Sequence, residues 1–157
     1  MEQILSQNAF NFEITAQSNP VDKVLMTTLI DIEGSEIIIS ENVKNKFTIR
    51  NRKDLSILQT VEHGFGFLRC GITYPDKEIV VLGIGNNLLE FNYEKREFIK
   101  NSQTIEEVFK LVKVNDNSFL TVEWFGYIEL INKIDLTCLS HLQIEGISGI
   151  YSIEKIR

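Results

Sequence analysis

Three segments of the chain repeat one pattern at intervals of about 40 residues, and this repetition limits the possible folds more than any other feature. The segments are Ser35 to Leu55, Lys77 to Glu97 and Asn117 to Leu136. Each contains an apolar stretch, a short polar or glycine-containing hinge, and a second stretch in which apolar and polar residues alternate. Alternation of this kind is typical of a strand with one buried face. Each segment therefore predicts two antiparallel strands joined at the hinge.

The second strands of the three segments can be aligned by their apolar residues. One column is formed by Phe47, Leu89 and Ile128, which are 42 and 39 residues apart, and a second column with the same spacing by Ile49, Phe91 and Leu130. Polar residues lie between the columns, namely Thr48, Glu90 and Glu129. We expect the residues of one column to occupy equivalent places in successive sheets.

Two further strands flank each segment. Ile30, Ile72 and Val112 each precede a turn of Gly, Pro, Asp or Asn residues, which favour turns because of their backbone preferences and short polar side chains. A fourth strand follows each segment, and the whole unit occupies about 40 residues. The sequence thus predicts a single domain of residues 1–157 with four-stranded units at about 24–64, 65–105 and 106–146.

Four antiparallel strands repeated at this period resemble the WD-repeat or WD-like β-propeller family, from about Val24 to Arg157. The resemblance implies an all-β fold of antiparallel four-stranded blades. Where the family has Trp-Asp, this chain has Ile49-Arg50, Phe91-Asn92 and Leu130-Ile131, and its Gly-His dipeptide is absent. Another propeller or β-repeat therefore stays open as an alternative.

The expected ring is incomplete. Beyond the three whole units, residues 147–157 predict a partial strand and residues 8–16, with alternating Phe10, Phe12 and Ile14, predict one extra strand. About three and a half blades result, whereas propellers close with four or more. An open end exposes several apolar side chains, at a cost on the order of 10 kcal/mol. We therefore expect the chain to be a fragment of a longer propeller, or to be completed by a second copy or by a partner.

The bulk composition excludes several classes of function. A net charge of −6 and a pI near 5.0 argue against nucleic acid or anionic lipid as a partner, because both require clustered basic residues. The longest apolar run, Ile79 to Gly85, is far shorter than the roughly 18 residues of a membrane span. Cys70 and Cys138 are isolated thiols. A cytoplasmic protein that does not contact membranes is expected.

The chain offers little material for catalysis or for a cofactor. Two cysteines and two histidines, His63 and His141, have no metal-site spacing. The Gly83-Ile84-Gly85-Asn86-Asn87 hinge lacks the third glycine of a dinucleotide fingerprint and is followed by a strand, so we interpret it as a turn. The adjacent acids Glu106 and Glu107 precede a strand as a solvated connection. We expect no enzyme activity, no cofactor and no metal.

A partner-binding surface is expected on the hinges, because tryptophan and tyrosine are enriched at interaction hot spots. The candidate residues are Trp124, Phe125, Tyr127, Asn86, Asn87, His63 and Phe65. The leading hypothesis is a scaffold that binds a protein or peptide and does no chemistry. Two alternatives stay open: a small stand-alone β-sandwich that binds and neutralises a partner enzyme, and a propeller enzyme with its site in a central channel. Trp124 packing between blades is the alternative to a binding role.

Overall fold

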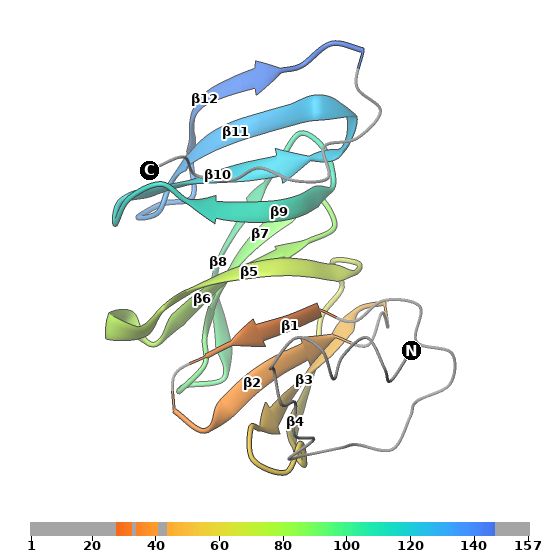
Figure 1. Ribbon diagram of the computed structural model, residues 1–157, viewed down its shortest axis with the longest axis vertical. Helices are drawn as coiled ribbons and strands as arrows, with labels where there is room; N and C mark the ends of the chain where they lie inside the picture. Colours follow the sequence, from red (N-terminus) through yellow and green to blue (C-terminus); the bar gives the residue numbers. More distant parts are fainter. Residues whose placement is uncertain (1–27, 33, 41–43, 147–157) are drawn as a thin grey trace, which may run out of the picture.

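Twelve strands make up the fold in the computed structural model, which describes residues 28–32, 34–40 and 44–146 (Figure 1). The first sheet consists of β1 (Thr28–Asp31), β2 (Glu36–Ser40), β3 (Lys46–Asn51) and β4 (Ile57–Glu62). The second consists of β5 (Leu68–Tyr74), β6 (Ile79–Ile84), β7 (Asn87–Asn92) and β8 (Glu97–Gln103). The third consists of β9 (Val108–Lys113), β10 (Ser118–Glu123), β11 (Tyr127–Asn132) and β12 (Cys138–Gln143).

Within each sheet every strand pairs antiparallel with its neighbour in sequence, so each sheet is a four-stranded meander. Among the described residues the helical segments are two 3-10 turns, η2 (Pro75–Lys77) and η3 (Trp124–Gly126). The first strands of successive sheets contact one another, β1 against β5 and β5 against β9. Figure 1 shows the three sheets following one another along the long axis. The predicted all-β class with antiparallel four-stranded units is confirmed, and the arrangement matches about three blades of a propeller.

Two apolar cores separate the three sheets. The core between the first and second sheets includes Ile38, Phe47, Ile49, Leu82, Leu89 and Phe91. The core between the second and third sheets includes Val81, Leu88, Val108, Phe119, Ile131 and Leu136. The central strands β6 and β7 of the second sheet therefore bury both of their faces, which explains why they are nearly continuous apolar runs. Each such side chain contributes roughly 1.5–3 kcal/mol on burial.

The predicted columns are wrong by one residue in the second sheet. Phe47 of the first sheet and Leu89 of the second sheet point toward each other and share the first core. Leu88 points the other way, into the core between the second and third sheets. The strands β3, β7 and β11 begin at Lys46, Asn87 and Tyr127, which are 41 and 40 residues apart rather than 42 and 39. Leu88 is therefore the equivalent of Phe47. Because side chains alternate along a strand, a slip of one residue moves each of them to the opposite face.

The turns divide between two ends of the sheets, which we call the hinge face and the turn face. The hinge face carries the hinges β2–β3, β6–β7 and β10–β11 and the connections that follow β4, β8 and β12. The turn face carries the other loops. On this face, the turn between the third and fourth strands of each sheet donates a hydrogen bond to the turn between the first and second strands of the same sheet. These bonds join Arg52 N–H to the Ser35 carbonyl at 2.6 Å, Tyr93 to Glu78 at 3.0 Å and Lys133 to Asn117 at 2.9 Å.

The expected extra strand at 8–16 and the partial strand at 147–157 lie outside the described residues. Within the described ranges, no helix has the length and apolar character needed to cross a membrane.

Candidate interaction face

The hinge face is held together by one backbone hydrogen bond that recurs in every sheet. The residue that follows the fourth strand donates its N–H to a hinge carbonyl: His63 to Asn45 at 2.8 Å, Thr104 to Asn86 at 3.0 Å and Ile144 to Gly126 at 3.1 Å. Each hinge is thereby fixed to the connection that leaves its own sheet. The repeat brings hinge residues from distant parts of the sequence together on the hinge face.

The central hinge is a packed turn that also ties the sheets together. β6 and β7 pair as far as Ile84 and Asn87, so Gly85 and Asn86 form a two-residue loop, as predicted for a turn. Gly85 donates its N–H to the Phe67 carbonyl at 3.1 Å and accepts from the Val108 N–H at 2.8 Å. A Cβ on Gly85 would lie 2.5 Å from the Phe65 carbonyl oxygen, at a φ of +56°. Glycine is therefore required by contact as well as by conformation.

His63 and Phe65 form an aromatic group above the first core. Their rings stack with centroids 6.2 Å apart, and the His63 ring also lies 5.9 Å from Phe47 and 6.5 Å from Phe98. The Phe65 N–H donates to His63 Nδ1 at 3.3 Å, which requires that nitrogen to be unprotonated. Burial lowers the pKa of His63. The side chain is thus a neutral aromatic support for the hinge face.

Trp124 and Phe125 belong to one turn but have different environments. The Trp124 backbone N–H donates to the Glu107 backbone carbonyl at 3.1 Å, and the Trp124 ring meets the Phe109 ring edge-on at a centroid distance of 5.6 Å. Phe125 has φ 59° and ψ 23°, a left-handed conformation, and its side chain is 57% exposed. Tyr127 is half-buried and begins β11. Trp124 is anchored by packing, whereas Phe125 points its ring toward solvent.

Asn86 and Asn87 lie between the two aromatic groups. Asn86 is exposed and its side-chain oxygen accepts from Asn87 Nδ2 at 3.1 Å, while Asn87 is half-buried. Thr104 N–H binds the Asn86 carbonyl, and Trp124 N–H binds Glu107 in the same connection. The predicted residues therefore form a row on the hinge face, from His63 and Phe65 through the asparagines to Trp124, Phe125 and Tyr127.

An ion pair between the start of β5 and the β8–β9 connection was not predicted from the sequence. Arg69 Nε lies 3.0 Å from Glu107 Oε1, and the Arg69 guanidinium carbon lies 5.2 Å from the Phe67 ring centroid. The partners are 38 residues apart in sequence, so the strand pattern gave no signal for their contact. Glu107 therefore neutralises an arginine, while the neighbouring Glu106 N–H donates to Glu123 Oε2 at 2.8 Å.

A buried carboxyl pair lies beneath the third hinge. Thr121 Oγ1 donates to Glu123 Oε1 at 2.5 Å and accepts from the Glu129 N–H at 3.2 Å. Burial, followed by contact with the Glu129 carboxyl, raises the pKa of Glu123 to about 7. Cys138, which pairs with Ile131 at the start of β12, has its pKa raised by burial and by the Glu129 carboxyl. Glu123 is thus a buried titratable group immediately before Trp124 in the third hinge.

No metal centre is assembled in the part of the chain that the structure describes: no three His, Cys, Asp or Glu residues gather closely enough there to hold an ion. Cys70 is half-buried beside Gly83, and burial raises the pKa of its thiol to about 12. A thiol with so high a pKa is a poor nucleophile near neutral pH.

Sheets, hinges and connections of this kind define a propeller-like all-β protein, and comparison with solved structures supports that class. The Saccharomyces cerevisiae protein Sqt1 superposes with a TM-score of 0.62 at 10% identity, over 74% of this chain and 33% of Sqt1. Hydrazine synthase of Kuenenia stuttgartiensis superposes with a TM-score of 0.61 at 9% identity, over 72% of this chain and 34% of that one. The chain spans about a third of each. At such identities the likeness concerns the fold alone. No family model and no curated protein sequence matches.

Proposed function

We propose that this chain is a protein–protein interaction scaffold built from WD-like propeller blades, that it binds a protein or peptide through the hinge face, and that it does no catalysis of its own. The observation that carries the proposal is the exposed phenyl ring of Phe125, which is held out by a left-handed backbone. A non-glycine residue in that conformation costs about 1–2 kcal/mol. Leu136 has nearly the same positive φ but is buried in the second core, so it is the 57% exposure of Phe125 in this conformation that favours a role outside the core.

The neighbours of Phe125 support a binding role. The Trp124 ring packs against Phe109 and its backbone N–H binds the Glu107 carbonyl, so the turn that carries Phe125 is held in place. Preorganised aromatic residues lose little conformational entropy on binding and dominate many interfaces. The exposed Asn86 adds hydrogen-bonding groups to the same row. The hinge face thus combines an apolar anchor with polar groups around it.

The third sheet supports completion of the ring by further blades. Ile128 on β11 is the equivalent of Leu88 on β7, yet Leu88 is fully buried whereas Ile128 is half-buried. Leu142, paired with Ile128 across β11 and β12, is 58% exposed. The chain spans about a third of the propeller-like structures that it matches. We propose that a longer chain, a second copy or a partner covers this side of the sheet.

The alternatives are less well supported. A β-sandwich has two facing sheets, whereas here three sheets follow one another and the middle one is buried on both faces. A cytoplasmic setting is supported by two free cysteines, one of them exposed, because free thiols are common in reducing compartments.

The proposal is tested by the variant Phe125→Asn. Asparagine tolerates the left-handed conformation and is favoured before glycine in a hairpin turn, so the free energy of unfolding should stay constant or rise by up to about 1 kcal/mol. Proteins that bind the hinge face should be lost when the tagged variant is purified from its own cells and the co-purifying proteins are quantified by mass spectrometry. The matched control is Ile99→Thr, which removes a 45% exposed apolar side chain from β8.

We expect a set of proteins that co-purifies with the original chain and with Ile99→Thr but is depleted with Phe125→Asn. Identical sets for all three chains would refute the hinge face as the binding surface. The stability measurement separates this outcome from misfolding, because the asparagine variant is expected to unfold at the same or a higher denaturant concentration.

A further inference from the structure

A cleft of about 170 Å³ opens between the second and third sheets near the turn face, away from the row of hinge residues. Its walls include Lys77 at the end of η2, Lys100 on β8, Lys133 after β11, Glu90 on β7, and the apolar side chains of Ile79 and Val81 on β6. Three lysine residues thus line one small cleft in a protein with net charge −6. The β5–β6 turn that contributes Lys77 is the left-hand tip of the second sheet in Figure 1.

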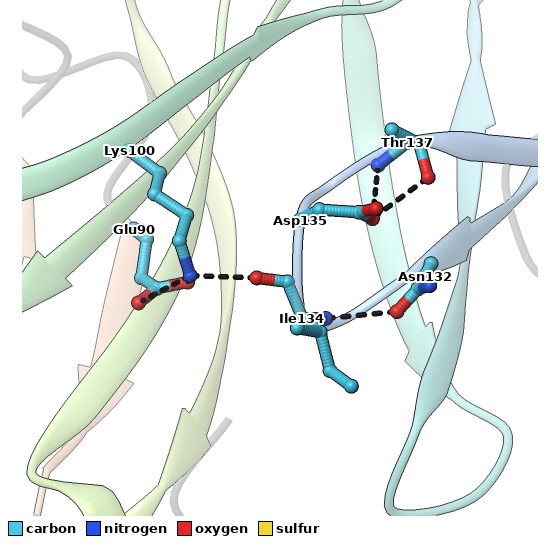
Figure 2. A network of polar contacts seen from close by, with 6 residues as sticks. All are labelled: Glu90, Lys100, Asn132, Ile134, Asp135 and Thr137. Atoms are coloured by element: carbon cyan, nitrogen blue, oxygen red, sulfur yellow. Dashed lines mark hydrogen bonds and ion pairs between the residues drawn. The ribbon is translucent and has the colours of Figure 1, made fainter.

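One of the three lysines already has its charge compensated. Lys100 Nζ lies 3.2 Å from Glu90 Oε2 and donates to the Ile134 carbonyl oxygen at 2.6 Å, as Figure 2 shows. The Glu90 side chain is nearly buried, so this pair is part of the joint between the sheets. The positive charge that remains for a ligand is therefore that of Lys77 and Lys133.

Lys133 is held in place by an aromatic ring rather than by an ion pair. Its Nζ lies 3.5 Å from the centroid of the Tyr74 ring, a cation–π contact, and its backbone N–H donates to Asn117. Neither Lys133 nor Lys77 forms an ion pair within residues 28–32, 34–40 and 44–146. The pKa of Lys133 is lowered by burial and then by the charge of Lys77, with smaller effects from Asp76, Lys113 and Asp116. Lys77 and Lys113 thus disfavour the charge of Lys133 while Asp76 and Asp116 favour it, and an anion bound between Lys77 and Lys133 would add to the favourable side.

We propose that this cleft is an anion site in which Lys77 and Lys133 bind one phosphate or carboxylate group of a ligand. Lysine binds phosphate as a compact point charge, and charge-assisted hydrogen bonds are about twice as strong as neutral ones. The cleft is smaller than the roughly 300 Å³ at which pockets for drug-sized molecules begin, so it accepts one anionic group and the few carbons next to it. Ile79 and Val81 provide the apolar wall for those carbons.

The site is independent of the proposed hinge-face interaction, because its residues belong to the turn face and the joint between the second and third sheets. It can therefore exist whether or not Phe125 binds a partner. The acidic balance of the chain makes a localised anion site more specific, since the rest of the surface repels anions in general.

The test is a titration of the whole chain with inorganic phosphate, with acetate and with a phosphoserine peptide, followed by backbone amide NMR at constant ionic strength. We expect saturable shifts at residues around Lys77, Lys133 and Ile134. The double variant Lys77→Gln/Lys133→Gln should raise the phosphate dissociation constant at least about tenfold. The matched control Lys53→Gln/Lys95→Gln removes two exposed lysines from other turns and should leave the constant unchanged.

Phosphate shifts that do not saturate, or an equal loss of affinity in the two double variants, would overturn the proposal, since either result indicates general charge screening. Tighter binding of the peptide than of phosphate would support the site and identify a partner's phosphorylated side chain as its source. Equal binding of the two would support the site for the free anion. Phe125→Asn should bind phosphate like the original chain, so failure at one site is distinguishable from failure at the other.

Discussion

Lys100 on β8 neutralises Glu90 on β7 across a Nζ–Oε2 distance of 3.2 Å, with the Glu90 side chain 6% exposed and that of Lys100 40% exposed. Glu90 occupies the place that Ile49 occupies in the first sheet, where the side chain is fully buried. The same ammonium donates to the Ile134 carbonyl of the third sheet. A carboxylate thus stands at an inter-sheet position where the repeat otherwise has an apolar residue, and one lysine compensates for it.

The variant Lys100→Met should lower the free energy of unfolding by about 1–2 kcal/mol in urea denaturation. Removing one partner leaves the Glu90 carboxylate buried without its counter-charge, and the partial exposure of Lys100 keeps the cost below that of a fully buried pair. The double variant Glu90→Leu/Lys100→Met should recover most of this loss, because an apolar pair suits the joint. Equal stability of Lys100→Met and the original chain would show that water already screens Glu90.

The fold was predictable because every unit carries its own turn chemistry and alternation. Gly34, Pro75 and the Asn115-Asp116-Asn117 turn mark the loops between first and second strands, and the described sheets turn at those places. The confirmed prediction is the four-stranded antiparallel unit. It needed only local signals, since each strand pairs with its neighbour in sequence.

The column alignment failed because β7 is apolar on both faces. Leu88 and Leu89 are both fully buried, so matching by hydrophobicity permits two registers. A better marker is the asparagine that ends the third strand in every sheet: Asn51, Asn92 and Asn132. Their side-chain oxygens accept backbone N–H groups of Lys53 at 2.8 Å, Lys95 at 2.7 Å and Ile134 at 2.9 Å. The geometry of the turn, rather than the apolar pattern, determines the register.

A double-mutant cycle checks this register. Phe47→Leu combined with Leu89→Ala should show a coupling energy of about 0.5 kcal/mol or more, because both side chains pack in the first core. Phe47→Leu combined with Leu88→Ala should be additive, since Leu88 belongs to the second core. Each alanine variant alone should cost about 2–5 kcal/mol in urea denaturation. Coupling to Leu88 in place of Leu89 would restore the alignment predicted from sequence.

The candidate sites differ in how many of their residues can be predicted from the sequence. Trp124 and Phe125 could be predicted as candidates because a hinge is a local feature of the sequence; their binding role stays a prediction. The anion cleft was not found, because Lys77 and Lys133 are 56 residues apart and come together only through the packing of one sheet on the next. The same holds for the Arg69–Glu107 ion pair.

Gly85→Ala should destabilise the protein by about 2–3 kcal/mol. The new Cβ would meet the Phe65 carbonyl oxygen at 2.5 Å in addition to the strain of a positive φ. Gly34→Ala is the matched control, since Gly34 also has a positive φ but nothing within 4 Å of its Cβ position. It should cost only about 1 kcal/mol. Thermal unfolding of both variants separates the two effects, and equal costs would mean that the central hinge can move away from Phe65.

Glu123 is a pH-sensitive group beneath the third hinge. The Glu123 pKa of about 7 results from burial and from the nearby Glu129 carboxyl, against hydrogen bonds from Thr121 and the Glu106 N–H that favour the charged form. The Glu129 Oε2 atom is buried without a hydrogen-bond partner among the described residues. The Glu123 carboxyl therefore keeps its proton to a higher pH than an ordinary glutamate does.

The folded state holds this proton more tightly than the unfolded chain, in which Glu123 titrates near 4.5. The stabilisation is therefore fully present below about pH 4.5 and is lost as the pH rises through about 7. Between about pH 5 and about pH 8 the free energy of unfolding should fall by about 1–3 kcal/mol more in the original chain than in Glu123→Gln, whose side chain stays neutral.

Subtracting the variant's profile removes the opposite contribution of His63, whose lowered pKa stabilises the fold as the pH rises through 6.5. Glu94→Gln, an exposed turn variant, should keep the full slope. If Glu123→Gln retains that slope as well, another group is responsible for the pH dependence.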